Sequence, residues 1–385
     1  MKRAKLLSII CILVILISLT ACVAENEPQD NDALLGTITE ISKYGNVKIS
    51  TTKAEMAEKG MEFGDVVTVS FADESIDVPY CETYSDVDAG AAGVFGRPDD
   101  DVVTIAVNVG DFATNYGIAT KTNHADQSYE WVYCEGVDAT VTFAISLKQK
   151  RGYYDEYVLH KLSYTDLRAD YPALSDEEFG NFRVVATTGM GEGVLYRSAT
   201  PVDPQKNRNV YVDAAARAHG ITVIINLNDS EDTLSAFDGF ETSYFATTDY
   251  VALNMGLDFT QDDFKQKLAE GLRYMGNHDG IYLVHCLEGK DRTGFVIALL
   301  EFLMGASYQE AEDDYMVTYH NYYGVDKGDP RYEVIATSNF EKNLLRSFGI
   351  QSVKDRDLVA VATEYMLSIG LSQEEITRLQ TVLSK

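Results

Sequence analysis

The sequence predicts two folded domains, a β-rich one followed by an α/β one, and two observations support this. First, residues 34–165 contain short runs of β-branched residues between Gly, Asp and Asn turns. Second, from residue 170 onward apolar residues at helical spacing alternate with short buried-strand patterns. We therefore expect a β-rich domain over 34–165 and a central sheet flanked by helices over 170–385.

The start of the chain has the pattern of a secretory signal. Three of the first five residues are basic, a continuous apolar run follows over 6–19, and Cys22 comes shortly after it. A transmembrane helix is the alternative, but this run is shorter than the roughly 20 residues that a span needs. The end of the run is similar to the bacterial lipobox, which implies a signal peptide over 1–21 and a lipid on Cys22. The acidic residues 22–33 then form a linker.

The charge of the chain excludes one class of partner. The formal net charge is −28, and without the basic residues of the signal, 29 basic against 60 acidic residues give −31. Nucleic acid binding requires a basic surface, so no nucleic acid is expected. The lipobox resemblance implies an extracytoplasmic chain, lipid-anchored to a bacterial membrane. In that setting Cys81 and Cys134 form either a disulfide or two buried thiols.

The β-rich domain is expected to contain strands over 66–71, 102–109 and 139–147. Its stretches YGNVKIS, GDVVTVSF, ETYSDVDAG and VTIAVNVGDFATNYG begin at residues 44, 64, 82 and 103. They resemble the C-terminal barrel of the S-adenosylmethionine hydroxide adenosyltransferases, over about 85 residues. In that family the barrel contributes to the nucleoside site of a preceding catalytic domain, which has no counterpart here. The resemblance therefore implies a barrel reused for binding or spacing, and identifies neither its ligand nor its partner.

In the α/β domain the periodicity predicts a helix over 207–219 and a strand over 221–227. Thr260 is expected to cap a helix that ends near Asn277, with a core-facing stripe four residues apart. That stripe consists of Phe264, Leu268 and Leu272. Capping boxes predict two more helix starts, near 308 and 373. The boxes are Ser307 with Glu310 and Ser372 with Glu375.

The stretch VHCLEGKDRTGF places Cys286 between an expected strand over 281–285 and an expected apolar helix over 293–304. Backbone N–H groups of such a turn and of the following helix start converge on an anion, and phosphate fits this position. The loop residues expected to bind it are Leu287, Glu288, Gly289, Lys290, Asp291 and Arg292. Gly289 permits close backbone approach, and the planar fork of Arg292 matches two phosphate oxygens.

The same positive field stabilises Cys286 as a thiolate, the nucleophilic form. The expected reaction is transfer of a phosphoryl group to sulfur, followed by hydrolysis, and it needs neither a metal nor a cofactor. Thr293 is expected to donate its hydroxyl to the sulfur, and His285 to orient the loop through ring hydrogen bonds.

The residues from His285 to Thr293 match HCxxxxxR(S/T), so the chain is identified as a member of the cysteine-dependent protein tyrosine phosphatases. GKDRTG, residues 289–294, resembles the bacterial tyrosine and dual-specificity branch, which also takes phosphoinositides. The likeness spans roughly 175–385 and includes LYRSATP, GITVIINLND, DYMVTYHNYYG and the C-terminal stretch EYMLSIGLSQEEITRLQTVL. It implies a phosphorylated protein or a small phosphomonoester as substrate.

The proton donor is left open between two aspartates, Asp291 in the loop and Asp258 before a helix, with Asp249 as a third candidate. A general acid must lie within hydrogen-bond reach of the leaving oxygen. Asp258 would alternatively cap the helix, and Asp291 would alternatively brace the neighbouring cations. Arg197 either contacts substrate or forms a surface ion pair.

Glu288 departs from the small residue common at this position of the family. A carboxylate directed into the loop would oppose both the thiolate and bound phosphate, whereas one directed into solvent would do neither.

Three functions fit these residues. The first is a lipid-anchored tyrosine or dual-specificity phosphatase. The second is an inositol-phosphate or phosphoinositide phosphatase. The third is a phosphate-recognising module whose β domain engages a second, unknown partner. An intact Cys286, Arg292 and two candidate acids favour an enzyme.

Overall fold

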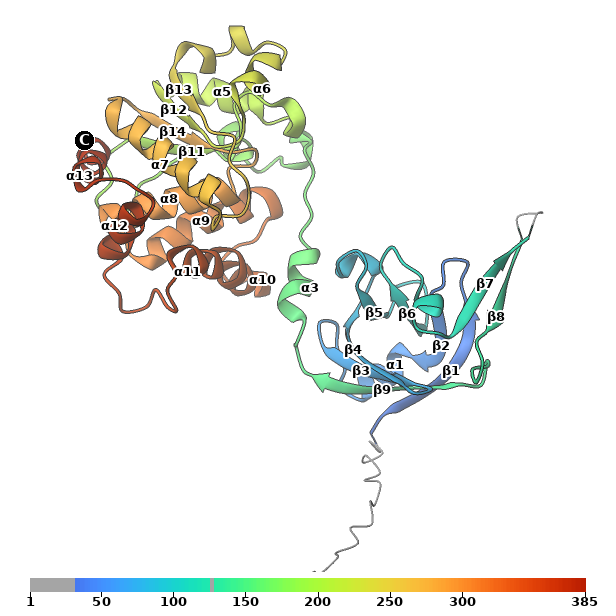
Figure 1. The fold of residues 1–385 in the computed structure, drawn as a ribbon. Coiled ribbons are helices and arrows are strands. Elements are labelled where there is room, and N and C mark those ends of the chain that lie inside the picture. The colour runs from blue at the N-terminus through green and yellow to red at the C-terminus, as the bar shows by residue number, and fades with distance from the viewer. Residues whose placement is uncertain (1–31, 125–127) are drawn as a thin grey trace, which may run out of the picture.

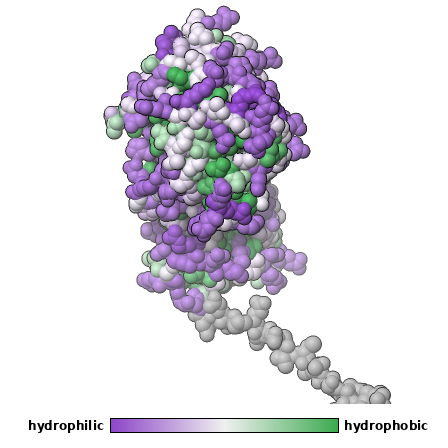
Figure 2. Space-filling model, turned by 90° about the vertical axis from the view of Figure 1, so that its left-hand side faces the viewer, coloured by the Kyte–Doolittle hydropathy of each residue, from purple (hydrophilic) through white to green (hydrophobic). Residues whose placement is uncertain are grey.

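The computed structural model describes residues 32–124 and 128–385, so the expected signal peptide and Cys22 lie outside the described residues. Figure 1 shows a β-barrel and an α/β body joined by a segment that contains helix α3, Tyr154–His160. None of the helices within the described ranges combines the length and the apolar composition that a membrane span requires. One face of the molecule, drawn in Figure 2, is mainly hydrophilic with scattered apolar patches.

The first domain is a closed barrel, which confirms the predicted β-rich fold. The strand order is β1-β2-β6-β5-β4-β3-β9, and all neighbours are antiparallel except β4 and β5. On β3, Val67, Val69 and Phe71 are buried and alternate with less buried residues, as expected of a strand with one face in a core. The barrel strands are β1 Leu34–Ile41, β2 Val47–Thr52, β3 Val66–Phe71, β4 Glu74–Cys81, β5 Ala92–Phe95, β6 Val102–Val107 and β9 Thr142–Gln149.

The barrel domain also carries short helices and the hairpin β7–β8. These elements are α1 Lys53–Glu58, the 3-10 helix η1 Tyr84–Asp86, α2 Phe112–Asn115, β7 Ala119–Asn123 and β8 Tyr129–Tyr133. Of the two alternatives for its cysteines, the structure contains free thiols and no disulfide. Cys81 is fully buried at the end of β4, whereas Cys134 is only partly buried after the hairpin. Burial raises the pKa of Cys81 to about 12, which keeps it protonated.

The second domain contains a five-stranded sheet with the order β10-β11-β14-β12-β13, in which only β10 is antiparallel to its neighbour. The strands are β10 Arg183–Val184, β11 Leu195–Ser198, β12 Val223–Asn226, β13 Asp249–Ala252 and β14 Tyr282–His285. Alternate residues of β12 and β14 face two separate apolar cores, one shared with α5 and the other with α7, α8, α9, α12 and α13. Helices therefore cover both faces of the sheet, as predicted.

The helices begin and end close to the predicted residues. Both capping boxes, at Ser307 and Ser372, are present. The cap predicted at Thr260 is wrong, because Asp258 accepts hydrogen bonds from the N–H and the hydroxyl of Thr260, and α7 starts after Gln261. The α-helices are α4 Asp176–Phe179, α5 Asn209–Ala218, α6 Glu231–Ala236, α7 Asp262–Asn277, α8 Asp291–Met304, α9 Tyr308–Tyr323, α10 Pro330–Ile335, α11 Lys342–Phe348, α12 Leu358–Ser368 and α13 Gln373–Leu383. The 3-10 helices are η2 Arg168–Asp170, η3 Pro204–Lys206, η4 Phe240–Thr242 and η5 Phe245–Thr247, and η6 Ala336–Glu341 is a π-helix.

The carboxyl ends of the parallel strands meet at one edge of the sheet. Ser198 of β11 and Asn226 of β12 both pair with His285 of β14. The loops that leave these strands therefore converge, and in open α/β sheets this edge is where ligands bind.

Candidate active site

The loop after β14 has its carbonyl groups held by the protein and its N–H groups free. The carbonyl oxygens of residues 287, 288 and 289 accept hydrogen bonds from Thr200 N, Tyr322 Oη and Arg197 Nη2, at 3.2, 3.0 and 2.9 Å. Among the described residues, none accepts a hydrogen bond from the N–H groups of 287–290. These donors are followed by the first turn of α8, whose N–H groups also lack helical partners. The arrangement is that of an anion site.

Gly289 is required for this loop conformation. Its φ is +69°, in the left-handed region, and an added Cβ would lie 2.2 Å from the Ser198 carbonyl oxygen. The close approach predicted for Gly289 thus occurs against β11, so the loop packs directly on the end of that strand.

Cys286 and His285 lie where the strand gives way to the loop. Cys286 is 3% exposed, and His285 is fully buried. Burial lowers the pKa of His285 to about 3, so the ring is neutral, and its Nδ1 lies 3.3 Å from the Cys286 carbonyl oxygen. Its Nε2 is buried without a partner among the described residues, so the orienting role of His285 stays a prediction. Thr293 is buried and its hydroxyl has no partner among the described residues, so the predicted bond to sulfur is not formed here.

Arg292 is fixed by backbone and amide oxygens of neighbouring loops. Its Nη1 donates to the carbonyl oxygens of Met255 and Leu227, at 2.9 and 3.3 Å, and its Nη2 donates to Asn228 Oδ1 at 2.7 Å. The Nε of Arg292 is buried without a partner in the part of the chain that is described. An unpaired buried donor is costly unless a ligand binds it, and a phosphate oxygen would do so. Of the five N–H groups of the guanidinium, these bonds use two on Nη1 and one on Nη2. The Nε–H and one N–H of Nη2 therefore stay available for phosphate oxygens.

The two leading candidates for the proton donor have opposite surroundings. Hydrogen bonds from Gln261 and Thr260, together with Arg346 at 3.2 Å, lower the pKa of Asp258 to about 2. The Asp291 side chain is 45% exposed, toward the pocket. Partial desolvation raises the pKa of its carboxyl, and Lys290 opposes this rise without cancelling it. A proton donor must be protonated before the reaction, so these surroundings favour Asp291. The third candidate, Asp249, is exposed at the amino end of β13, away from the edge where the loops converge.

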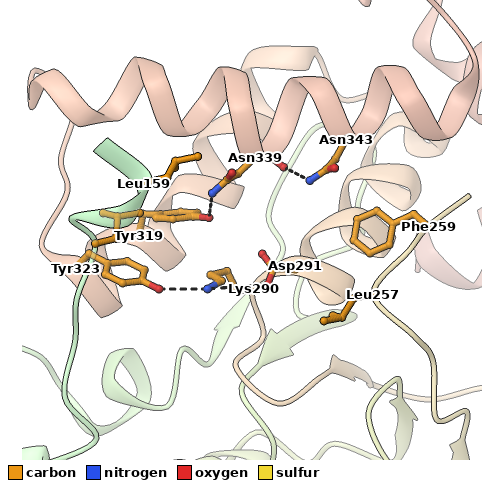
Figure 3. Close-up of a pocket in the computed structure, with 10 residues that line it drawn as sticks. Leu159, Leu257, Phe259, Lys290, Asp291, Tyr319, Tyr323, Asn339 and Asn343 are labelled. Carbon is orange, nitrogen blue, oxygen red and sulfur yellow. Dashed lines mark hydrogen bonds and ion pairs between the residues drawn. The ribbon is translucent and has the colours of Figure 1, made fainter. Parts of the chain in front are cut away.

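Asp291 and Lys290 line a pocket of about 370 Å³, drawn in Figure 3. Asp291 is the first residue of α8, which begins two residues earlier than predicted. Figure 3 shows Phe259 and Leu257 on one side of the pocket and Tyr319 and Tyr323 on the other. The remaining lining residues are Leu159, Leu162, Asn339 and Asn343.

The Glu288 carboxylate is not directed freely into solvent, and cations and a hydroxyl group balance its negative charge. Its carboxylate lies 2.9 Å from Lys290 Nζ and 3.6 Å from Lys206 Nζ, and it accepts a hydrogen bond from the Tyr164 hydroxyl. Burial alone would raise the pKa of Glu288, but Lys290 and Tyr164 outweigh it and lower that pKa. The negative charge of Glu288 is therefore balanced by neighbouring side chains.

Two polar side chains that support the loop, Asn181 and Asp314, were not identified from the sequence. Asn181 Nδ2 donates to the carbonyl oxygens of Glu288 and Gly289, at 3.1 and 3.3 Å. Arg197 is fully buried and pairs with Asp314, so the predicted surface ion pair is a buried one that braces the loop. The LYRSATP stretch gave a signal for Arg197, but nothing local indicated Asn181 or Asp314.

Comparison with known proteins identifies relatives of both domains. A family model described as the tyrosine phosphatase family matches residues 178–383, and one described as the SAM hydroxide adenosyltransferase C-terminal domain matches residues 36–124. A tyrosine-protein phosphatase from Nostoc commune is 30% identical over 140 residues, covering 34% of this chain and 47% of that protein. The chain thus spans about half the length of this curated relative.

Three solved structures are similar at low identity. The core catalytic domain of the PP-IP phosphatase SIW14 from S. cerevisiae, in complex with citrate, is 20% identical; the match covers 43% of this chain and 89% of that one, with a TM-score of 0.27. The Yvh1 phosphatase domain from Chaetomium thermophilum is 16% identical, with coverage of 51% and 94% and a TM-score of 0.22. An uncharacterized conserved protein from Thermotoga maritima is 21% identical, with coverage of 30% and 36% and a TM-score of 0.23.

Proposed function

Because the chain belongs to the tyrosine phosphatase family, we propose that it hydrolyses phosphate monoesters through a phosphocysteine formed on Cys286. The observation that carries the proposal is the loop after Cys286, whose N–H groups and Arg292 Nε have no described protein partner. Main-chain donors and a guanidinium stabilise the charge on a transferring phosphoryl group without reorganisation.

In the first step the Cys286 thiolate attacks phosphorus, and the bond from phosphorus to the ester oxygen breaks. The protonated Asp291 carboxyl gives its proton to the leaving oxygen, so an alcohol or phenol departs. In the second step a water molecule attacks the phosphocysteine and the phosphorus–sulfur bond breaks. The Asp291 carboxylate takes a proton from that water, which restores thiolate and acid and releases inorganic phosphate.

The substrate class is proposed from the pocket beside the loop. Phe259, Tyr319 and Tyr323 line the pocket, and such walls suit an aromatic leaving group such as the phenol of a phosphotyrosine side chain. The acidic chain is poorly suited to inositol phosphates that carry many charges. We therefore favour a protein tyrosine or dual-specificity phosphatase over an inositol-phosphate phosphatase.

The activity is tested on protein lacking residues 1–22, assayed in EDTA with four substrates. These are a phosphotyrosine peptide, a phosphoserine peptide, a phosphoinositide and inositol hexakisphosphate. We expect the highest kcat/KM on the phosphotyrosine peptide, and acid quenching during turnover should leave phosphorus on Cys286. Turnover without any phosphorus on that residue contradicts the proposed mechanism, and preferred turnover of an inositol phosphate contradicts the substrate class.

The location of the chain is also a proposal. The apolar run over 6–19 and the residues before Cys22 favour processing as a bacterial lipoprotein, which places the catalytic domain outside the cytoplasm. Cells expressing the full chain should incorporate labelled palmitate into it, and Cys22→Ala should remove the label. A chain that carries no label in the wild-type form contradicts this location.

A further inference from the structure

The segment that joins the two domains reaches the pocket that Lys290 and Asp291 line. It ends before residue 178, where the match to the tyrosine phosphatase family begins. Helix α3 of this segment packs against α10 of the α/β domain. Leu159, at its end, and Leu162, just after it, line the same pocket as Lys290 and Asp291. The pocket wall opposite Phe259 is therefore partly built from residues outside the family domain (Figure 3).

Tyr164, two residues farther along, contacts the phosphate loop itself. Its hydroxyl donates to Glu288 and accepts a hydrogen bond from Lys206 Nζ at 2.7 Å. Its ring packs edge-on against Tyr322 and Tyr323, with centroids 5.0 and 5.4 Å apart. Burial raises the pKa of Tyr164, and the charge of Glu288 raises it further, so the hydroxyl keeps its proton and remains a donor.

The charges around Glu288 explain how the hydrogen bond from Tyr164 would affect the active site. Glu288 is two residues from Cys286, and an unbalanced carboxylate there disfavours both a thiolate and a bound phosphate dianion. Lys206 and Lys290 are both within 4 Å of the Glu288 carboxylate. The Tyr164 hydroxyl bridges Lys206 and Glu288, which fixes the carboxylate among these cations.

Building on the proposed phosphatase activity, we propose that residues 159–164 are part of the active site. Tyr164 is a positioning residue that holds the Glu288 carboxylate in its ion pairs. Leu159 and Leu162 form an apolar wall that contacts the leaving group of the substrate and favours aromatic esters over small alkyl ones.

The positioning role is tested with Tyr164→Phe in protein lacking residues 1–22. We expect kcat/KM on an aryl phosphate to fall about tenfold, mainly through a higher KM, since a hydrogen bond to a charged group is lost. The acidic limb of the kcat/KM profile should also move to higher pH, because a freer carboxylate disfavours the thiolate. Tyr44→Phe is the matched control, because Tyr44 is exposed in the barrel domain.

A double variant separates positioning from a general structural effect. In a Glu288→Gln background, Tyr164→Phe should change kcat/KM by less than about twofold and should not move the acidic limb, since the charge it controls is gone. If the loss persists in this background, Tyr164 acts only through folding and the proposal is overturned. An active wild type whose Tyr164→Phe variant is unchanged also overturns it.

The apolar wall is tested with the variant Leu159→Ala/Leu162→Ala. The control is Leu167→Ala, because Leu167 lies in the same segment and is 62% exposed. The ratio of kcat/KM for naphthyl phosphate to that for glycerol phosphate should fall about fivefold, as apolar contact with the larger group is lost. An unchanged ratio overturns the wall, and this measurement decides the matter even if Tyr164→Phe fails to fold. If the wild type itself shows no turnover, the result contradicts the proposed phosphatase activity. It does not contradict the role of residues 159–164 specifically.

Discussion

Cys286→Ser should lower kcat/KM on p-nitrophenyl phosphate by at least about 10⁴-fold, because a serine hydroxyl is not ionised at neutral pH. The loop surrounds this position with donors, namely free N–H groups and Arg292 Nε, and the Glu288 carboxylate is held by Lys290, Lys206 and Tyr164. The measurement is initial rate in EDTA on protein lacking residues 1–22.

The anion site should survive this substitution, because the donors that form it belong to the backbone and to Arg292. Vanadate is therefore expected to bind Cys286→Ser, though more weakly than wild type, as measured by calorimetry. Cys134→Ser is the matched control, since Cys134 is a free, partly buried thiol in the barrel domain and should keep full activity. Metal-dependent turnover that persists in Cys286→Ser would end the cysteine mechanism.

The parts of the site that are contiguous in sequence were predictable. The strand, the loop and helix α8 follow one another within residues 281–304, and their local patterns determine their type. The predicted start of α8 was wrong by two residues. The helix begins at Asp291, whereas the apolar periodicity starts only after the loop residues. The prediction of Thr260 as a cap was wrong because its hydroxyl donates a hydrogen bond to Asp258, and the helix starts after Gln261.

The parts that depend on long-range contacts were not predictable. Arg197 is buried because Asp314, 117 residues away, pairs with it, and no local pattern shows that partner. The environment of Glu288 depends on Tyr164, 124 residues earlier. Sequence alone therefore left the direction of Glu288 open, and the ion pairs in the fold resolve it.

The assignment of Asp291 rather than Asp258 as the proton donor predicts a second large loss of activity, in the variant Asp291→Asn. Asp291→Asn should lower kcat/KM about 100- to 1,000-fold on an alkyl phosphate, which needs a proton on its leaving oxygen, since general acids contribute on this order. The comparison uses kcat/KM because this constant reports the first step, before the Asp291 carboxylate acts on water. On an activated aryl phosphate such as p-nitrophenyl phosphate the loss should be below about tenfold, because that leaving group departs without a proton. This contrast separates proton donation from a change in the charge beside Lys290, which would affect both substrates alike.

The pH dependence gives a second sign of the same residue. Partial desolvation raises the pKa of Asp291, so its acid form persists to higher pH than that of an ordinary carboxyl, and the rate falls above that pKa. Asp291→Asn has no proton to lose, and its profile on the alkyl ester should lack this alkaline decline. Asp258→Asn should change kcat by less than about threefold, because hydrogen bonds and Arg346 already keep Asp258 ionised. If Asp258→Asn alone produces the leaving-group contrast, then Asp258 moves in the bound complex and takes the role assigned here to Asp291.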